Sequence, residues 1–234
     1  MITCMDDQIG RVLAALEKRG MRENTLIFFI SDNGGNLSAM MAGELDVSKI
    51  KLPSSNGPYR GGKGMLYEGG TRVAALANWP GHIKAGEVDG MIHMVDMLPT
   101  LAGLTGAPLA RSKALDGMDV WPAISEGKPS PRTEVVYNVE PFRGAVRRGD
   151  WKLVWRTPLP SALELYNIKE DPSEKNDMAS QRPETVRELQ KRIEELAAGM
   201  AKPLFLQAAM TAIKGRPATP PALPNDEAYF DQEP

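Results

Sequence analysis

The sequence predicts an α/β fold over residues 1–133, a small antiparallel sheet with one helix over residues 134–200, and an Ala/Pro-rich tail over residues 201–234. Unbroken apolar runs and helical apolar spacing in the first part are typical of a mostly parallel sheet with flanking helices. Shorter alternating segments separated by turn residues characterise the second part. The third part has the composition of an extended segment without a core of its own.

The composition is that of an ordinary globular chain, with 234 residues, 42% of them hydrophobic and 25% charged. The net charge of −2 offers no basic face for non-specific nucleic-acid binding. The sequence contains no run of the roughly 18 apolar residues that a membrane span needs, and no signal-peptide pattern opens it. Cys4 is the single cysteine, so an intramolecular disulfide is excluded and the compartment stays undetermined.

A first helix is expected from the third or fourth residue. Ile9, Val12, Leu13 and Leu16 share one helical face, and Gly20 is the expected end of the helix. Because the sequence begins almost inside this helix, we expect the chain to be a portion of a longer protein.

Two strands are predicted next. Leu26 to Ile30 is a continuous apolar run, the pattern of a strand buried on both faces of a parallel sheet, and Val73 to Trp79 is a second such run. Residues 36–58 between them are polar and lack periodicity, which predicts a long loop. A helix is then expected from about Pro99, with Asp96 as its cap and Gly103 or Gly106 at its end.

The second part is expected to contain short strands within residues 134–168. Gly149 and Asp150 suit a two-residue hairpin turn with glycine first. Pro183 is the expected start of a helix, because proline favours the first helical position. Its apolar face would consist of Val186, Leu189, Ile193 and Leu196.

Asp32 and Asn33 directly follow the first predicted strand, at the edge where α/β proteins bind ligands. A carboxylate and an amide oxygen are the hard ligands that Ca²⁺ and Mg²⁺ prefer. The sequence Asp-Asn-Gly-Gly also favours a simple turn. Both interpretations stay open on these residues alone.

Lys63 lies in the glycine-rich segment GPYRGGKG, which nearly matches a phosphate-binding P-loop. Gly64 stands where that motif needs a Ser or Thr, and no clear strand precedes the loop, so a nucleotide site is disfavoured. A lysine on a glycine loop can still bind a sulfate or phosphate oxygen, with a solvated surface lysine as the alternative. His82 and His93 lack the spacing of a helical zinc pair and are expected to be structural.

Four segments in order, covering roughly residues 5–197, resemble the sulfatase family, whose fold is that of alkaline phosphatase. They are MDDQIGRVLAALEKRGMRENTLIFFISDNGG, GGKGMLYEGGTRVAALANWPGHIKAG, HMVDMLPTLAGLTG and VRRGDWKLVW with ELYNIKEDPSEKND. The resemblance implies that Asp32 and Asn33 bind a divalent cation, usually Ca²⁺ in the family, with Mg²⁺, Mn²⁺ or Zn²⁺ as alternatives. It implies that Lys63 binds the sulfate of the substrate.

The family's nucleophile is a formylglycine made in a Cys/Ser-x-Pro-x-Arg motif, which this sequence lacks; Cys4 is followed by Met-Asp-Asp. Three hypotheses follow. The chain is the C-terminal portion of a sulfate ester hydrolase whose nucleophile lies in a missing N-terminal half. Alternatively, it is a stand-alone hydrolase of phosphate esters or phosphotriesters that uses metal-bound hydroxide and acids of residues 36–58, as a homodimer. The third hypothesis is a non-enzymatic binding module.

Overall fold

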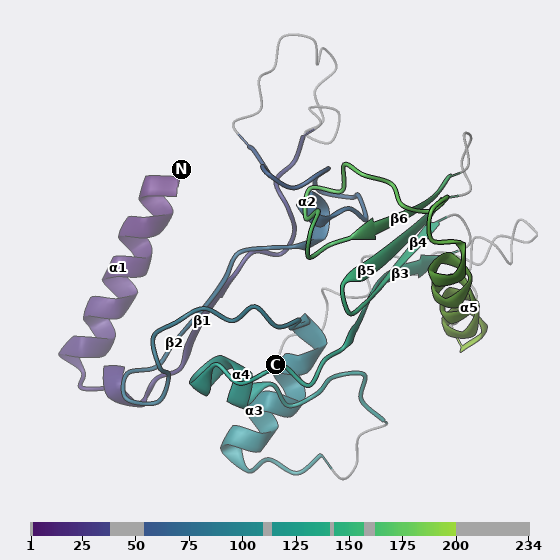
Figure 1. The fold of residues 1–234 in the computed structure, drawn as a ribbon. Coiled ribbons are helices and arrows are strands. Elements are labelled where there is room, and N and C mark those ends of the chain that lie inside the picture. The colour runs from purple at the N-terminus through teal and green to yellow at the C-terminus, as the bar shows by residue number, and fades with distance from the viewer. Residues whose placement is uncertain (1, 38–53, 110–113, 141–142, 157–161, 200–234) are drawn as a thin grey trace, which may run out of the picture. The chain divides into compact units, whose positions relative to one another are not determined.

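The structure is a computed structural model that describes residues 2–37, 54–109, 114–140, 143–156 and 162–199 (Figure 1). The chain divides into two compact units, Met1–Ile193 and Glu194–Pro234. The predicted tail and most of the predicted loop at residues 36–58 lie outside the described residues. None of the described helices is long and apolar enough to cross a membrane.

The first predicted helix is confirmed as α1 (Ile2–Lys18), which a short 3-10 helix, η1 (Arg22–Asn24), follows. Gly20 adopts a φ of +64°, the left-handed conformation that ends helices and that glycine adopts without strain. No residue of α1 is fully buried among the described residues: Ile9, Leu13 and Leu16 are half-buried and Val12 is 60% exposed.

The two predicted strands are present as β1 (Ile27–Ile30) and β2 (Ala75–Asn78), but they pair antiparallel. The predicted mostly parallel sheet is therefore not confirmed, because both sheets of the described residues are antiparallel (Figure 1). An apolar run indicates a strand but does not encode the direction of its neighbour. Phe29 and Leu76 are partners in the register and are 37% and 67% exposed, so the described residues do not bury this sheet on both faces.

In the part of the chain that the structure describes, four short helices lie between the strands, the first between β1 and β2 and the other three after β2. They are α2 (Glu68–Thr71), η3 (Met94–Asp96), α3 (Met97–Thr105) and α4 (Trp121–Glu126). The helix expected from Pro99 is α3, and Gly106 with a φ of +67° ends it rather than Gly103. Asp96 is the N-cap residue of α3, as expected, but its carboxylate makes no cap bond to this helix and accepts from the His93 N–H and from Arg132 instead.

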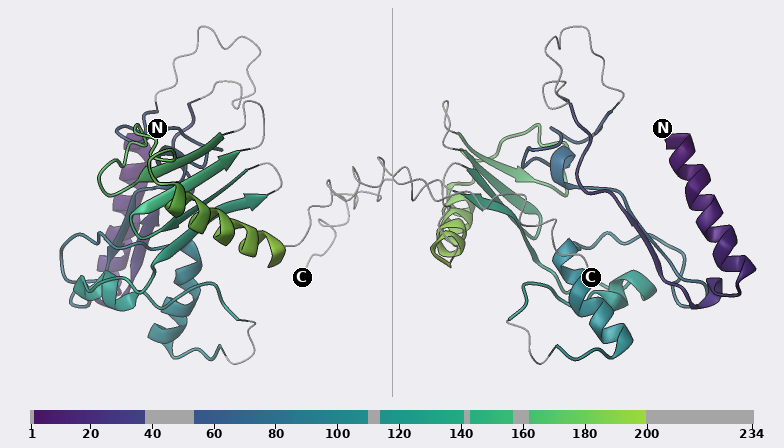
Figure 2. Two further views of the ribbon diagram at one scale, coloured as in Figure 1. Left: turned by 45° about the vertical axis from the view of Figure 1, so that its right-hand side comes forward. Right: turned by 180° about the vertical axis from the view of Figure 1, so that it is seen from behind.

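The strands predicted in residues 134–168 form one four-stranded antiparallel sheet in the order β3-β4-β5-β6 (Figure 2). The strands are β3 (Glu134–Glu140), β4 (Arg143–Arg148), β5 (Trp151–Arg156) and β6 (Ala162–Asn167). Arg148 pairs with Trp151 across the predicted hairpin turn. Gly149 has a φ of +56°, as a two-residue turn with glycine first requires.

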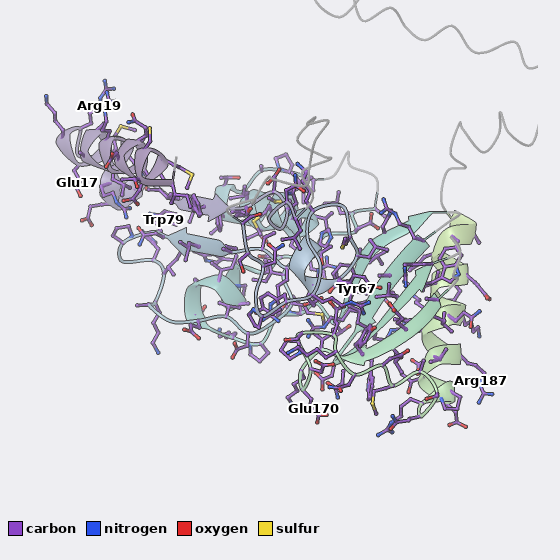
Figure 3. The ribbon with its side chains drawn as sticks, turned by 90° about the horizontal axis from the view of Figure 1, so that it is seen from above. Glu17, Arg19, Tyr67, Trp79, Glu170 and Arg187 are labelled. Carbon is purple, nitrogen blue, oxygen red and sulfur yellow. The ribbon has the colours of Figure 1, made fainter. Side chains whose placement is uncertain are left out.

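The last helix, α5 (Pro183–Gly199), begins at the predicted proline. Val186, Leu189 and Ile193 of the predicted apolar face are buried, and Leu196 is half-buried. A separate apolar cluster joins Tyr67, which precedes α2 and is labelled in Figure 3, to four residues of the sheet region. These four are Ala145, Val154, Tyr166 and Ile168. Tyr67, four residues after Lys63, therefore packs against buried residues of the four-stranded sheet.

Candidate functional site

Asp32 and Asn33 lie in the turn that follows β1. The Ser31 N–H donates to the Ala74 carbonyl at 3.1 Å, which extends the β1–β2 pairing to the edge of this turn. Asp32 Oδ1 accepts from the Asn33 N–H at 2.9 Å, and Asn33 Nδ2 donates to the Gly34 carbonyl at 2.9 Å. These bonds orient the Asp32 carboxylate, and within the part of the chain that the structure describes they leave Asn33 Oδ1 available to a ligand.

Lys63 lies on a loop whose backbone meets the turn after β1. The Lys63 N–H donates to the Gly35 carbonyl at 3.1 Å, while the lysine side chain is exposed. Gly61 and Gly64 have φ values of +75° and +83°, so glycine at these two positions lets the loop fold around Lys63 without strain. The structure therefore joins by main-chain contact the two segments that carry Asp32, Asn33 and Lys63.

The glycines of the turn allow a close backbone approach. The Gly34 N–H donates to the Gly70 carbonyl at 3.0 Å, and a Cβ added at Gly34 would lie 1.8 Å from the carbonyl oxygen of Gly69. Gly34 is not among the residues with positive φ. Glycine is needed at this position because it has no side chain, and not because of its backbone conformation. Sequence reasoning found the turn but not this contact with α2.

Arg60 anchors the Lys63 loop to the four-stranded sheet. Its guanidinium donates to Tyr166 Oη at 2.6 Å and lies 3.9 Å from the centre of the Tyr67 ring, a cation–π distance. Burial, together with the hydrogen bond to Glu164, raises the pKa of Tyr67 to about 12. Since Arg60 already has these partners, Lys63 is the better candidate on this loop for binding an anion.

Three buried charged side chains form a cluster between β5, α2 and the segment after β6. Lys152 of β5 forms ion pairs with Glu68 Oε1 at 2.8 Å and with Glu174 Oε1 at 3.1 Å, and all three side chains are at most 1% exposed. Tyr137 adds its hydroxyl at 3.0 Å from Glu68 Oε1 and its ring at 4.1 Å from Lys152 Nζ. Sequence reasoning missed this group, because nothing local marks a lysine in a strand as buried.

The two histidines make local contacts. His93 Nδ1 accepts from the Val95 N–H at 3.2 Å and caps η3, and burial, with Arg132 nearby, lowers the pKa of His93. His82 stacks on Trp79 with ring centroids 4.1 Å apart. In the described part of the chain, no group of three or more His, Cys, Asp or Glu side chains is arranged to hold a metal ion.

The donors of Asp32 and Asn33 fit part of a cation site. Two hard oxygen donors adjacent in one turn suit Ca²⁺ or Mg²⁺, but Ca²⁺ takes about 6 to 8 oxygen ligands. The acids of residues 36–58, which the second hypothesis invoked, are Glu44 and Asp46, and both lie outside the described residues. The turn can therefore begin a coordination shell, and Lys63 can add a positive charge for an anion bound beside it.

Comparison with known families decides the relationship. Residues 1–107 match the family model Sulfatase, and residues 61–199, more than half of the chain, match the model N-sulphoglucosamine sulphohydrolase, C-terminal. The chain belongs to the sulfatase family. The first match includes Asp32, Asn33 and Lys63.

Individual sulfatases confirm the relationship. The chain is 33% identical to arylsulfatase J of Mus musculus over 173 residues, which are 72% of this chain and 27% of that protein. It is 28% identical to N-acetylgalactosamine-6-O-sulfatase of Bacteroides thetaiotaomicron, covering 84% of this chain and 41% of that protein. The crystal structure of Ps i-CgsB in complex with k-i-k-neocarrahexaose superposes with a TM-score of 0.74 at 26% identity, covering 99% of this chain and 49% of that chain.

The chain thus corresponds to part of a sulfatase domain, with the alkaline phosphatase-like fold of that family. It spans between about a quarter and two fifths of the length of the two curated sulfatases named above. Members of the family are hydrolases of sulfate esters and generally depend on a divalent metal.

Proposed function

We propose that this chain is the C-terminal portion of a sulfatase that hydrolyses sulfate esters, in which Asp32 and Asn33 bind Ca²⁺ and Lys63 binds the substrate sulfate. The observation that carries the proposal is the hydrogen bond from the Lys63 N–H to the Gly35 carbonyl at 3.1 Å. It holds a cationic side chain on a loop that is bonded to the turn with the two hard oxygen ligands.

Each residue then has a separate task. The Asp32 carboxylate and the Asn33 amide oxygen hold the cation, which supplies electrostatic stabilisation of charge on a sulfate oxygen when it is bound. The exposed Lys63 ammonium orients the sulfate and neutralises charge that grows on its oxygens in the transition state. The nucleophile comes from residues outside this chain, since the Cys/Ser-x-Pro-x-Arg motif is absent from the sequence.

Binding measurements on the purified full chain test these assignments. Calorimetry with Ca²⁺ is expected to show binding that falls at least about tenfold in Asp32→Ala and in Asn33→Ala, as loss of groups at metal sites generally does. Sulfate binding, followed by amide chemical shifts, is expected to weaken by about tenfold in Lys63→Ala, because a charge-assisted hydrogen bond is lost. Lys169→Ala removes another exposed lysine and is the control. A wild-type chain that binds neither ion contradicts the proposal.

Activity is tested on the chain joined to its own upstream portion. The DNA preceding residue 1 is expected to encode Cys/Ser-x-Pro-x-Arg in frame, and the joined protein to hydrolyse aryl sulfates until chelator is added. An upstream region without the motif contradicts the proposal. Aryl phosphates and phosphotriesters belong in the same panel, because chelator-sensitive turnover of these by the chain alone would favour a stand-alone hydrolase instead.

A further inference from the structure

Asn56 lies between the two segments of the candidate site and bonds to both. Its Oδ1 accepts from the Gly35 N–H at 2.6 Å, and its Nδ2 donates to the carbonyls of Gly35 at 2.9 Å and Gly61 at 3.0 Å. Gly35 comes two residues after Asn33, and Gly61 two residues before Lys63. One half-buried amide therefore connects the backbone beside the cation ligands to the backbone beside the lysine.

The surrounding glycines leave the space that this amide occupies. A Cβ added at Gly35 would lie 3.0 Å from Asn56 Oδ1, and a Cβ added at Gly62 would lie 2.8 Å from Asn56 Nδ2 and 2.5 Å from the Gly35 carbonyl oxygen. The Ser54 hydroxyl also donates to the Asn36 carbonyl, so residues 54–56 follow the turn over more than one residue. Asn56 is thus built into the junction rather than placed on its surface.

The Asn56 amide fixes the separation between the backbone at Gly35 and the backbone at Gly61, which neither segment fixes alone. Gly35 presents both its N–H and its carbonyl to Asn56, so its peptide orientation is held on two sides. The Gly35 carbonyl also accepts from the Lys63 N–H, so a shift of Asn56 changes the backbone position of Lys63 as well. Hydrogen bonds joined in one network polarise one another, so their energies are coupled.

Building on the proposed function, we infer that Asn56 is a positioning residue that couples cation binding at Asp32 and Asn33 to sulfate binding at Lys63. Bound cation then strengthens sulfate binding, and bound sulfate strengthens cation binding by the same factor, as linkage requires. Without Asn56 the part of this coupling that depends on the bonded backbone of Gly35 and Gly61 is lost. A residue that only stabilised the fold would not change how strongly bound sulfate raises the affinity for the cation. Asn56 is inferred to change this dependence.

The test is calorimetry of the purified full chain with Ca²⁺, with and without saturating inorganic sulfate. In the wild type, sulfate is expected to raise the Ca²⁺ affinity by about fivefold or more. In Asn56→Ala this factor is expected to fall below about twofold, while the Ca²⁺ affinity measured without sulfate stays within about threefold of the wild type. Gly35→Ala, whose added Cβ would crowd Asn56 Oδ1 and Ser54 Cβ at 3.0 Å, is expected to lower the coupling factor as well. It replaces Asn56→Ala in the test if that variant does not fold.

Asn167→Ala is the matched control. Asn167 is also a half-buried asparagine, and its Oδ1 accepts from the N–H groups of Lys169 and Glu170 in a turn after β6. Its replacement is expected to lower thermal stability and to leave the coupling factor unchanged.

The outcomes separate the inference from the proposed function. A wild-type chain that binds both ions without coupling overturns the inference alone, as does unchanged coupling in Asn56→Ala or an equal loss of coupling in Asn167→Ala. A wild-type chain that binds neither ion overturns both the inference and the proposed function.

Discussion

Lys152 Nζ lies 2.8 Å from Glu68 Oε1, and both side chains are buried. Glu68 begins α2, and the next two residues, Gly69 and Gly70, meet the backbone of Gly34 beside the candidate cation ligands. The Glu68 N–H donates to Glu174 Oε2 at 2.5 Å, so a second buried carboxylate holds the first residue of α2. The four-stranded sheet therefore supports the candidate site through a short series of contacts from Lys152 to Gly34.

Replacing Lys152 by methionine is expected to lower the free energy of unfolding by about 3–5 kcal/mol, because it keeps most of the side-chain volume and leaves Glu68 and Glu174 buried without their cation. Urea denaturation at neutral pH measures the change. Lys128→Met is the control, because the pair of Lys128 with Glu126 is more than half exposed, and such a pair contributes about 0–1 kcal/mol. Equal losses in the two variants would contradict the importance of the buried pair.

Glu174 is expected to make stability decrease with rising pH. Burial raises the pKa of Glu174 above its ordinary value of 4.5, in spite of the opposing influence of Lys152. A raised pKa in the folded state means that the contribution of Glu174 is complete below the unfolded pKa and is lost as the pH rises through the folded pKa. Glu174→Gln carries a neutral amide that does not titrate, so its stability relative to the wild type is expected to increase as the pH rises above 4.5.

Urea denaturation at pH steps between about 4 and 8 measures this difference between wild type and variant. The exposed Glu170→Gln serves as the control. A difference between wild type and Glu174→Gln that does not change with pH would show that the buried carboxyl does not titrate in this range.

Asp96 is expected to act in the opposite direction. Burial by itself would raise the pKa of Asp96, but hydrogen bonds from Arg132 and from the backbone of His93 and Met118 lower it below 3.8. A lowered pKa gives stability that is present above the unfolded pKa and is lost as the pH falls through the folded pKa. Asp96→Asn leaves Arg132 without its anion and is expected to cost about 3–5 kcal/mol at neutral pH.

The cost of Asp96→Asn should shrink as the pH falls below 3.8, where the wild-type carboxyl gains its proton. Chemical denaturation at neutral and acidic pH follows this convergence. Glu184→Gln, which removes an exposed pair with Arg187, provides the comparison and is expected to change stability little at either pH.

Gly34→Ala and Gly10→Ala are expected to have opposite effects. A Cβ at Gly34 would overlap the Gly69 carbonyl, whereas a Cβ at Gly10 would meet nothing within 4 Å. Gly34→Ala is therefore expected to lower thermal stability and to weaken Ca²⁺ binding about tenfold or more, because the turn must shift. Gly10→Ala, inside the exposed helix α1, is expected to stabilise by about 0.5–1 kcal/mol. Thermal denaturation and calcium calorimetry of both variants check these expectations, and unaltered Ca²⁺ binding in Gly34→Ala would contradict the first.

Elements whose signals are local were predicted well from the sequence. The apolar spacing and Gly20 predicted α1, Pro183 marked the start of α5, and Gly149 predicted the hairpin between β4 and β5. Each of these depends on residues within a few positions of one another, where periodicity and turn chemistry apply. The resemblance of four ordered segments to sulfatases was likewise contained in the sequence and is confirmed.

The sequence by itself determined the family, the helices α1, α3 and α5, the hairpin and the candidate ligands Asp32, Asn33 and Lys63. Only the tertiary structure decided that β1 and β2 run antiparallel, that Lys152 is buried between two carboxylates, and that Asn56 joins the turn to the lysine loop. The physical reason is that these relationships connect residues far apart in the chain. Local patterns describe each partner but not which partners meet.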